Sequence, residues 1–471
     1  MVSNRQNAKD SFREAREMAL DRLLLRPDRI TEGPRAGEWP CIKRVVYALG
    51  KAAHHFSLID WLGSQDMTPK IYWRDRDGQF EMAGLGAAVS VHSSIAPEYG
   101  QLIEAMKLFL NPDEPKLRFW GGFSFDSERS KGTDTAWRKF GCYNFVIPRF
   151  ELHRTADSLE LAVNINYEED KDYLADIAEE LRELTFPAYG IYNLLPEVTG
   201  RRDVPSKRGW TKNINTALKA FKTTELEKVV LARRATFKFE QPPSPAAMMN
   251  KLSESADDCF CFLFQPTEDA AFVCVTPERL YHREGRTIRT EAIAGTRARG
   301  EDDASDLALG NELLKSGKDI AEHDYVVKSL RDSLNQLCLS SGEKAGRDLL
   351  KLANVQHLIT RFEGELKPDI GDGDILSELH PTPAVGGHPG ALAMGLIEEL
   401  EPFERGWYAA PVGWIGDEAA EFAVGIRSGL LHRNQLHLFS GAGIVSDSQA
   451  DQEWDEIERK ISNFLSVIDQ S

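Results

Sequence analysis

Residues 421–443 read EFAVGIRSGLLHRNQLHLFSGAG, two apolar runs separated by the polar segment HRNQ. The runs at 421–432 and 435–443 have the length and the residue types of strands. A short polar turn between two such runs favours antiparallel pairing. We therefore expect this stretch to form two neighbouring antiparallel strands of a sheet.

Similar strand-like runs occur upstream and determine the class of fold. They lie at 228–239, 259–265, 270–276 and 357–366. Helical patterns lie near 305–339, 390–400 and 449–468. The order is not a regular alternation of strand and helix. It predicts an α+β fold of large antiparallel sheets flanked by helices. Residues 1–205 read as mixed structure, with short strands and an amphipathic N-terminal helix, and contain no recognisable catalytic cluster.

Composition excludes several classes of protein. The chain has 471 residues, with 57 Lys and Arg against 74 Asp and Glu, a formal net charge of −17. This charge argues against a nucleic-acid partner and against docking on an anionic membrane. No apolar segment approaches the roughly 20 residues that cross a bilayer, and residues 1–25 mix acidic and basic residues with no signal-peptide core, so we expect a cytoplasmic protein. The six cysteines have no zinc-site spacing and are expected to be buried, reduced thiols.

The strand-like run 421–431 suggests an anion site. If the run is one strand, alternation places two sets of side chains on opposite faces. One face carries Phe422, Val424, Ile426 and Leu430, and the other carries Ala423, Gly425, Arg427 and Gly429. Small residues around one guanidinium leave room for a ligand, and Arg suits a bidentate grip on a carboxylate. Gly441 and Gly443, in the next strand, would let backbone N–H groups approach an anion, or form only a bulge.

The C-terminal stretch QEWDEIERK, residues 452–460, carries a second polar group of side chains. In a helix, Glu453, Glu456 and Lys460 fall within one arc of about 60°, whereas Asp455 and Arg459 point elsewhere. The arc borders an apolar stripe that faces a core. The stripe consists of Trp454, Ile457, Ile461 and Phe464.

The stretch KDIAEHDYVVKSL, residues 318–330, repeats this arrangement with Asp319 and Glu322 three residues apart beside an apolar stripe. Two helices that each aim two carboxylates at the border of a core could together hold a divalent cation. Mg²⁺ prefers oxygen ligands and keeps water or substrate oxygens in its shell. On a solvated surface, the same pairs would add only a little helix stability.

Three further positions are candidates for chemistry. Lys228 opens the run 228–239, and Glu278 follows the run 270–276. A Lys and a Glu on adjacent strands facing one cavity could act as base and acid, provided that the pKa of the lysine is lowered and the glutamate stays protonated. The loop 379–389, LHPTPAVGGHP, is a surface connection or a pocket rim, and His380 in it could line a pocket.

Eight segments in order resemble the chorismate-utilising enzymes, and within them the isochorismate synthases of the menaquinone pathway. The segments are KVVLARR (228–234), TPERL (276–280), EAIAGTRARG (291–300), AEHDYVV (321–327), LHPTPAVGG (379–387), RGWYAAPVGWIG (405–416), GIRSGLL (425–431) and SGAGIVSDSQADQEWDEIERK (440–460). The resemblance covers most of the chain from about 206 to 465. In residues 1–205, KIYWRDRDG (70–78) and WGGFSFD (120–126) are also similar to the menaquinone-pathway members.

The resemblance implies the anthranilate synthase component I-like fold, with residues 1–205 contributing to the same sheet scaffold and 206–471 forming the chorismate-binding catalytic region. It implies Mg²⁺-dependent conversion of chorismate to isochorismate. Lys228 matches the base that activates water for attack at ring C2, and Glu278 matches the acid that protonates the departing C4 hydroxyl. Glu322 and Glu456 match metal ligands, with Glu453 and Asp319 as neighbouring acidic positions. The family usually has Glu where this chain has the shorter Asp319, and these neighbouring acidic positions act on the metal directly or through water.

The same resemblance assigns the remaining positions to substrate binding. Arg427, Tyr408 and the backbone of Gly441 and Gly443 match the grip on the pyruvyl carboxylate. Lys460 matches the site of the ring carboxylate, and Gly295 and Thr296 match the pocket floor.

Two alternatives stay open at this point. One is a salicylate synthase, which forms isochorismate and then eliminates pyruvate, and the other is a non-catalytic chorismate-binding protein. The ammonia-using members of the family differ at HPTPAVGG, so we expect a monomer with no glutaminase subunit.

Overall fold

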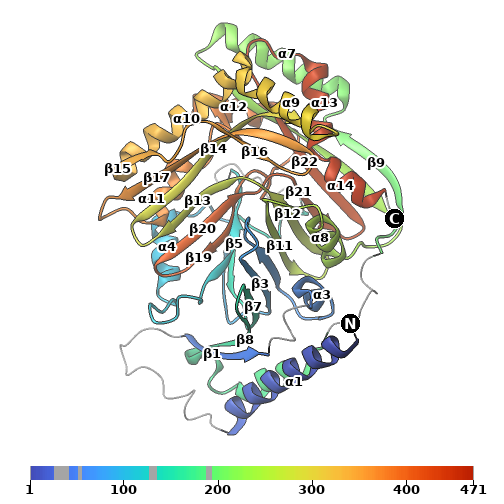
Figure 1. Ribbon diagram of the computed structural model, residues 1–471, viewed down its shortest axis with the longest axis vertical. Coiled ribbons are helices and arrows are strands. Elements are labelled where there is room, and N and C mark those ends of the chain that lie inside the picture. Colours follow the sequence, from blue (N-terminus) through green and yellow to red (C-terminus); the bar gives the residue numbers. More distant parts are fainter. Residues whose placement is uncertain (1, 26–41, 51–55, 127–134, 187–193, 470–471) are drawn as a thin grey trace.

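Two large antiparallel sheets form the framework of the protein, seen here in a computed structural model (Figure 1). The structure describes residues 2–25, 42–50, 56–126, 135–186 and 194–469. Aromatic side chains from both sheets share one core cluster, in which the rings of Trp73 and Trp120 lie 6.2 Å apart. The predicted class, large antiparallel sheets flanked by helices, is confirmed.

Within the described residues the larger sheet has twelve strands. Their order is β1 (Ile42–Leu49), β8 (Leu159–Asn166), β7 (Phe150–Thr155), β3 (Phe80–Leu85), β2 (Lys70–Arg74), β11 (Phe260–Thr267), β12 (Ala270–Thr276), β21 (Ser428–His432), β22 (Gln435–Ile444), β10 (Lys228–Phe239) and β18 (Gly387–His388), with β9 (Val198–Val204) also pairing β10.

The smaller sheet has ten strands in the same part of the chain. Their order is β15 (Cys338–Glu343), β17 (Val355–Leu366), β14 (Thr287–Ala298), β13 (Arg279–Glu284), β20 (Ala419–Val424), β19 (Pro411–Ile415), β5 (Phe119–Phe123), β6 (Tyr143–Ile147) and β4 (Val89–Ser93), with β16 (Asp348–Lys351) pairing β17. Because β2 pairs with β11 and β5 with β19, backbone hydrogen bonds join residues 1–205 to the rest of the chain in both sheets.

The helices cover the ends and the outer faces of the sheets. They are α1 (Val2–Leu25), α3 (Leu58–Gly63), α4 (Tyr99–Lys107), α5 (Tyr167–Asp170), α6 (Leu174–Glu183), α7 (Lys207–Thr223), α8 (Pro245–Ser253), α9 (Asp303–Lys315), α10 (Gly317–Leu337), α11 (Asp372–Leu379), α12 (Gly390–Leu400), α13 (Ala450–Lys460) and α14 (Ser462–Ile468). In Figure 1, α7, α9, α10, α12 and α13 gather at one end of the molecule, and α1 lies at the other. No helix among the described residues is long and apolar enough to span a bilayer.

The stretch 421–443 folds partly as its sequence predicts. β21 and β22 pair antiparallel through the turn at His432 and Gln435, which confirms the hairpin. The prediction of one continuous strand over 421–432 is wrong, because β20 belongs to the smaller sheet and β21 to the larger. The chain crosses between the sheets at 425–427, where Arg427 has φ +48°. The proposed two-face alternation therefore ends at Gly425, and Arg427 lies in the crossover itself.

Two predicted helical regions are each divided in two. The region 305–339 consists of α9 and α10, and the hydroxyl of Ser316 between them accepts a hydrogen bond from the N–H of Asp319 (3.4 Å). The region 449–468 breaks at Ile461 into α13 and α14. The five cysteines among the described residues are buried thiols that form no disulfide, as predicted, and Cys41 lies outside these residues.

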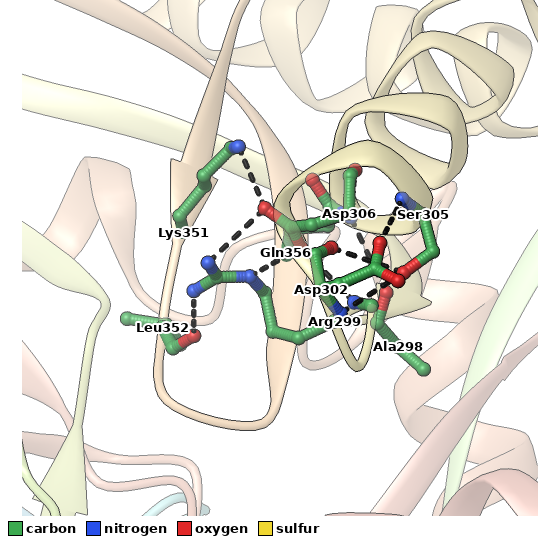
Figure 2. Close-up of polar contacts among 9 residues, drawn as sticks. Ala298, Arg299, Asp302, Ser305, Asp306, Lys351, Leu352 and Gln356 are labelled. Atoms are coloured by element: carbon green, nitrogen blue, oxygen red, sulfur yellow. Dashed lines mark hydrogen bonds and ion pairs between the residues drawn. The ribbon is translucent and has the colours of Figure 1, made fainter.

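A polar cluster at the start of α9 fixes how this helix follows β14 (Figure 2). The guanidinium of Arg299 donates to both carboxylate oxygens of Asp306 (2.6 and 3.1 Å), and the ammonium of Lys351 donates to one of them (2.8 Å). These hydrogen bonds hold the pKa of the Asp306 carboxyl below its usual value. The cluster therefore anchors the connection between β14, which carries Gly295 and Thr296, and α9, which leads directly into α10.

A buried ion pair attaches α11 to the smaller sheet and offers a test of the packing. Arg283 donates to both carboxylate oxygens of Asp372 (2.8 and 2.7 Å), and the hydroxyl of Tyr281 also donates to this carboxylate (3.1 Å). Asp372→Asn leaves the guanidinium buried without its counter-charge. We expect the free energy of unfolding to fall by about 3–5 kcal/mol. Denaturant unfolding would measure this, with the exposed Asp369→Asn as the control; equal stability of the two variants would contradict the role of the pair.

Candidate active site

One cavity of about 620 Å³ brings together almost all of the predicted site residues. It is bordered by the start of β10, the turn before β13, the end of β14, helices α10 and α13, the crossover at 425–427 and the end of β22. The predicted residues that line it are Lys228, Glu278, Gly295, Thr296, Asp319, Glu322, Tyr408, Arg427, Gly441, Gly443, Glu453, Glu456 and Lys460.

His380 is not among the lining residues of this cavity. Its ring Nε2 lies 3.1 Å from the carbonyl oxygen of Phe125, and its ring packs edge-on against the Phe125 ring. The loop that begins at Leu379 still reaches the cavity, because Ala384 and Val385 line it. The loop therefore forms part of the rim, but His380 binds the N-terminal half of the chain instead.

Lys228 is the first residue of β10 and is 1% exposed. Its Nζ lies 3.2 Å from Oε1 of Glu322 on α10. Lys228 and Glu278 line the same cavity, as expected, but their strands are not adjacent: β21 and β22 lie between β12 and β10. The expectation that Lys228 and Glu278 lie on adjacent strands is thus wrong. After the crossover near Arg427 the chain re-enters the larger sheet as β21 and β22, and these two strands lie between β12 and β10.

Glu278 lies in the turn between β12 and β13 and is 7% exposed. Burial, and then the negative charge of Glu291, raise its pKa to about 7, against the opposing effects of Lys228, Lys460 and Arg427. At neutral pH a substantial fraction of this carboxyl is therefore protonated and can donate a proton.

Arg427 is held by a histidine that the sequence analysis did not single out. Its guanidinium lies 2.8 Å from Nε2 of His357 on β17, and Nδ1 of His357 lies 3.1 Å from the carbonyl oxygen of Gly295. Since a guanidinium only donates, Nε2 accepts and Nδ1 carries the proton. Burial and then the charge of Arg427 lower the pKa of His357 to about 3, so the ring is neutral. His357 lies directly opposite Thr296, because β17 and β14 pair as neighbouring strands. The sequence alone does not reveal this register.

The end of β22 leaves no room for side chains. A Cβ at Gly441 would lie 3.0 Å from the hydroxyl oxygen of Tyr408, whose ring stacks on Phe439. The ammonium of Lys460 donates to the carbonyl of Gly441 (2.9 Å) and pairs with Glu456 (2.7 Å). Glycine at this position therefore allows the backbone itself to line the cavity.

Gly443→Ala is expected to lower turnover more than stability. The added Cβ would lie 2.9 Å from Cε of Lys228 and 3.1 Å from Oε1 of Glu322. The long lysine side chain can move away, so the fold survives, but its amine leaves its position. A displacement of this size is expected to cost about 10²-fold in kcat. Steady-state kinetics and a melting curve measure both effects. Gly395→Ala on α12, with no atom within 4 Å of its Cβ, is the control. Unchanged kcat would contradict the steric account.

The four acidic residues expected at the metal site all border the cavity, and three of them pair with basic side chains. Glu322 pairs with Lys228, Glu456 with Lys460, and Asp319 with Arg297 (2.9 Å). Glu453 is 4% exposed; burial, and then the charges of Glu456 and Glu322, raise its pKa. Among the described residues, no three acidic, His or Cys side chains come together to hold a metal ion by themselves. Their carboxylate oxygens are the kind of ligand that Mg²⁺ prefers, and such an ion would take the rest of its ligands from water and bound substrate.

Three further basic residues line the cavity. They are Arg297 on β14, Lys318 at the start of α10 and Arg459 on α13. The expectation that Arg459 points away from the site is wrong. Arg459 is the neighbour of Lys460 on α13, and its side chain is long enough to border the cavity from outside the arc of Glu453, Glu456 and Lys460.

Comparison with known proteins decides the family. Residues 43–469 match the family model described as "Chorismate binding enzyme". The chain belongs to the chorismate binding enzyme family. It is 32% identical to isochorismate synthase MenF of Bacillus subtilis, over 90% of this chain and 97% of that protein.

Two solved structures have the same fold. The structure of MenF, the menaquinone-specific isochorismate synthase from Escherichia coli, matches with a TM-score of 0.84 at 29% identity, over 97% of this chain and 100% of that one. Anthranilate synthase component I from Streptococcus pneumoniae shares the fold with a TM-score of 0.68 at 19% identity, over 82% and 92% of the two chains. The family and the chorismate-binding fold expected from the sequence are thereby confirmed.

Proposed function

We propose that the protein is an isochorismate synthase that converts chorismate to isochorismate. The observation that carries this proposal is the buried pair Lys228 and Glu278 on one cavity of a chorismate binding enzyme, one side chain an amine and the other a carboxyl with a pKa of about 7. Relatives that match over most of their length are named isochorismate synthases. One base and one acid are what an exchange of ring hydroxyls requires.

In the proposed reaction, the amine of Lys228 takes a proton from a water molecule as its oxygen bonds to ring C2. The ring double bonds shift, the C4–O bond breaks, and Glu278 donates its proton to the leaving hydroxyl, which departs as water. One water enters and one leaves, so the product is an isomer of the substrate. The two side chains then return to their starting protonation states by exchange with solvent. Each transfer typically contributes about 10²–10⁴-fold to the rate.

The substrate is a dianion, and the cavity supplies positive charge at both ends of it. Arg427, oriented by neutral His357, would bind the pyruvyl carboxylate together with Tyr408 and the backbone of Gly441 and Gly443. Lys460 would bind the ring carboxylate. Gly295 and Thr296 form the floor beneath the ring. His357 connects the two parts of the site, because it contacts the carbonyl oxygen of Gly295 through Nδ1 and Arg427 through Nε2.

We also propose that Mg²⁺ binds at Glu322 and Glu456, with Glu453 and Asp319 beside them. When bound, it would offset the charge of the ring carboxylate. Burial, and then the negative charges of Glu456 and Glu322, raise the pKa of Glu453; a cation would offset these charges, which supports this placement. Asp319 already pairs with Arg297, which favours an indirect role for it. The product would enter menaquinone biosynthesis. Because the nucleophile is water and not ammonia, the enzyme would need no glutaminase subunit. We propose that it acts as a monomer.

The test is to incubate the purified protein with chorismate, either with Mg²⁺ or with EDTA, and to separate the products by liquid chromatography and mass spectrometry. Isochorismate formed with Mg²⁺ and not with EDTA is the expected result. Salicylate with pyruvate would make the protein a salicylate synthase. Chorismate binding without turnover would make it a non-catalytic binding protein, and either result would overturn the proposal.

A further inference from the structure

An arginine from the N-terminal half of the chain reaches the backbone beside Glu278. Arg76 lies in the turn between β2 and β3, and its guanidinium donates to the carbonyl of Pro277 (3.0 Å), the residue before Glu278. The same guanidinium donates to both carboxylate oxygens of Glu291 on β14 (2.6 Å each). Neither Arg76 nor Glu291 lines the cavity.

The pair is enclosed and specific in geometry. The side chain of Arg76 is 14% exposed and that of Glu291 is 3% exposed. Arg279 also donates to Glu291 (3.2 Å), and both guanidinium groups lie over the ring of Phe260. A bidentate, partly desolvated contact of this kind fixes the position of both partners. Glu291 is thereby held where its charge acts on Glu278.

We propose that Arg76, through Glu291 and the carbonyl of Pro277, is a positioning residue for the acid Glu278. The inference rests on the proposed function and extends it to residues 1–205. Residues 1–205 then do more than complete the sheets. The side chain of Arg76 fixes the turn that contains Glu278 and holds the charged carboxylate of Glu291 near it.

The charges around Glu278 determine the direction of each effect. Glu291 on β14 raises its pKa, while Lys228 on β10, Lys460 on α13 and Arg427 in the crossover lower it. Removing the charge of Glu291 should therefore lower the pKa of Glu278. Removing the charge of Arg76 exposes Glu278 to more of the negative charge of Glu291 and should raise the pKa of Glu278. Loss of a purely structural contact would not shift the two variants in opposite directions.

The experiment is to measure kcat and KM for chorismate as a function of pH in the wild type, Arg76→Gln, Glu291→Gln and the double variant. The rate falls above the pKa of the acid, so this basic limb reports on Glu278. We expect Glu291→Gln to move the limb to lower pH and Arg76→Gln to move it to higher pH, by about one pH unit each. The double variant should lie between the two. KM should stay near that of the wild type.

Two controls keep the inference testable if Arg76→Gln folds poorly. Arg76→Lys keeps the charge but cannot grip Glu291 and Pro277 together, so kcat should fall while the limb stays in place. Arg154→Gln breaks a comparable pair with Glu81 on β3, and it should leave both unchanged. An active Glu291→Gln enzyme whose limb stays at the wild-type pH, or an Arg76→Lys enzyme with the wild-type kcat, would overturn the inference alone. A wild-type protein that makes no isochorismate would overturn the proposed function as well.

Discussion

Replacing Lys228 by alanine is expected to lower kcat for isochorismate formation by about 10²–10⁴-fold. The amine is 1% exposed on the cavity wall, and among the described residues that line the cavity we assign the role of base to no other side chain. Without it, the attacking water must lose its proton to bulk solvent. Steady-state kinetics with product detection measures the loss.

The control separates a lost base from a lost fold. Lys238→Ala changes an exposed lysine at the other end of the same strand, β10, and should leave kcat unchanged. Circular dichroism and a melting curve should show that Lys228→Ala is folded. Activity of a folded Lys228→Ala protein within a few-fold of the wild type would rule out Lys228 as the base.

Glu278→Gln is expected to cause a loss of similar size, about 10²–10⁴-fold in kcat, because an amide cannot give a proton to the departing hydroxyl. The wild type should also lose activity as the pH rises. The acid works in its protonated form, which predominates below a pKa of about 7 and disappears above it. The pH profile of kcat should therefore have a basic limb near pH 7, and the residual activity of Glu278→Gln should lack it.

The matched control is Glu284→Gln, an exposed glutamate at the end of the next strand, β13. It should retain the rate and the basic limb of the wild type. If Glu278→Gln kept the wild-type limb near pH 7, a different group would be the acid.

Local sequence patterns predicted the parts of the site that depend on one element. The arc of Glu453, Glu456 and Lys460 follows from helical periodicity alone, and all three line the cavity. The start of β10 at Lys228 and the hairpin of β21 and β22 follow from apolar runs and a polar turn. The residues that the ordered motifs singled out also line this cavity, namely Glu278, Gly295, Tyr408, Gly441 and Gly443.

Features that depend on how distant elements meet were not predicted. The run EFAVGIRSGLL has strand-forming residues throughout, so its sequence contains no sign that the chain changes sheets at Gly425. His357 acquires its role from its strand register opposite Thr296. Arg76 lies 215 positions from Glu291 in the sequence, and only the pairing of β2 with β11 brings its turn to the site. His380, by contrast, had a suggestive motif but packs against Phe125.

The most direct test of the proposed chemistry is turnover of chorismate in water enriched in oxygen-18, with the mass of the isochorismate measured before it can exchange. If Lys228 activates a water molecule for attack at C2 while Glu278 releases the C4 hydroxyl, each product molecule carries one oxygen-18 atom. Unlabelled isochorismate would mean that the substrate's own hydroxyl is transferred, and would contradict the roles assigned to both residues.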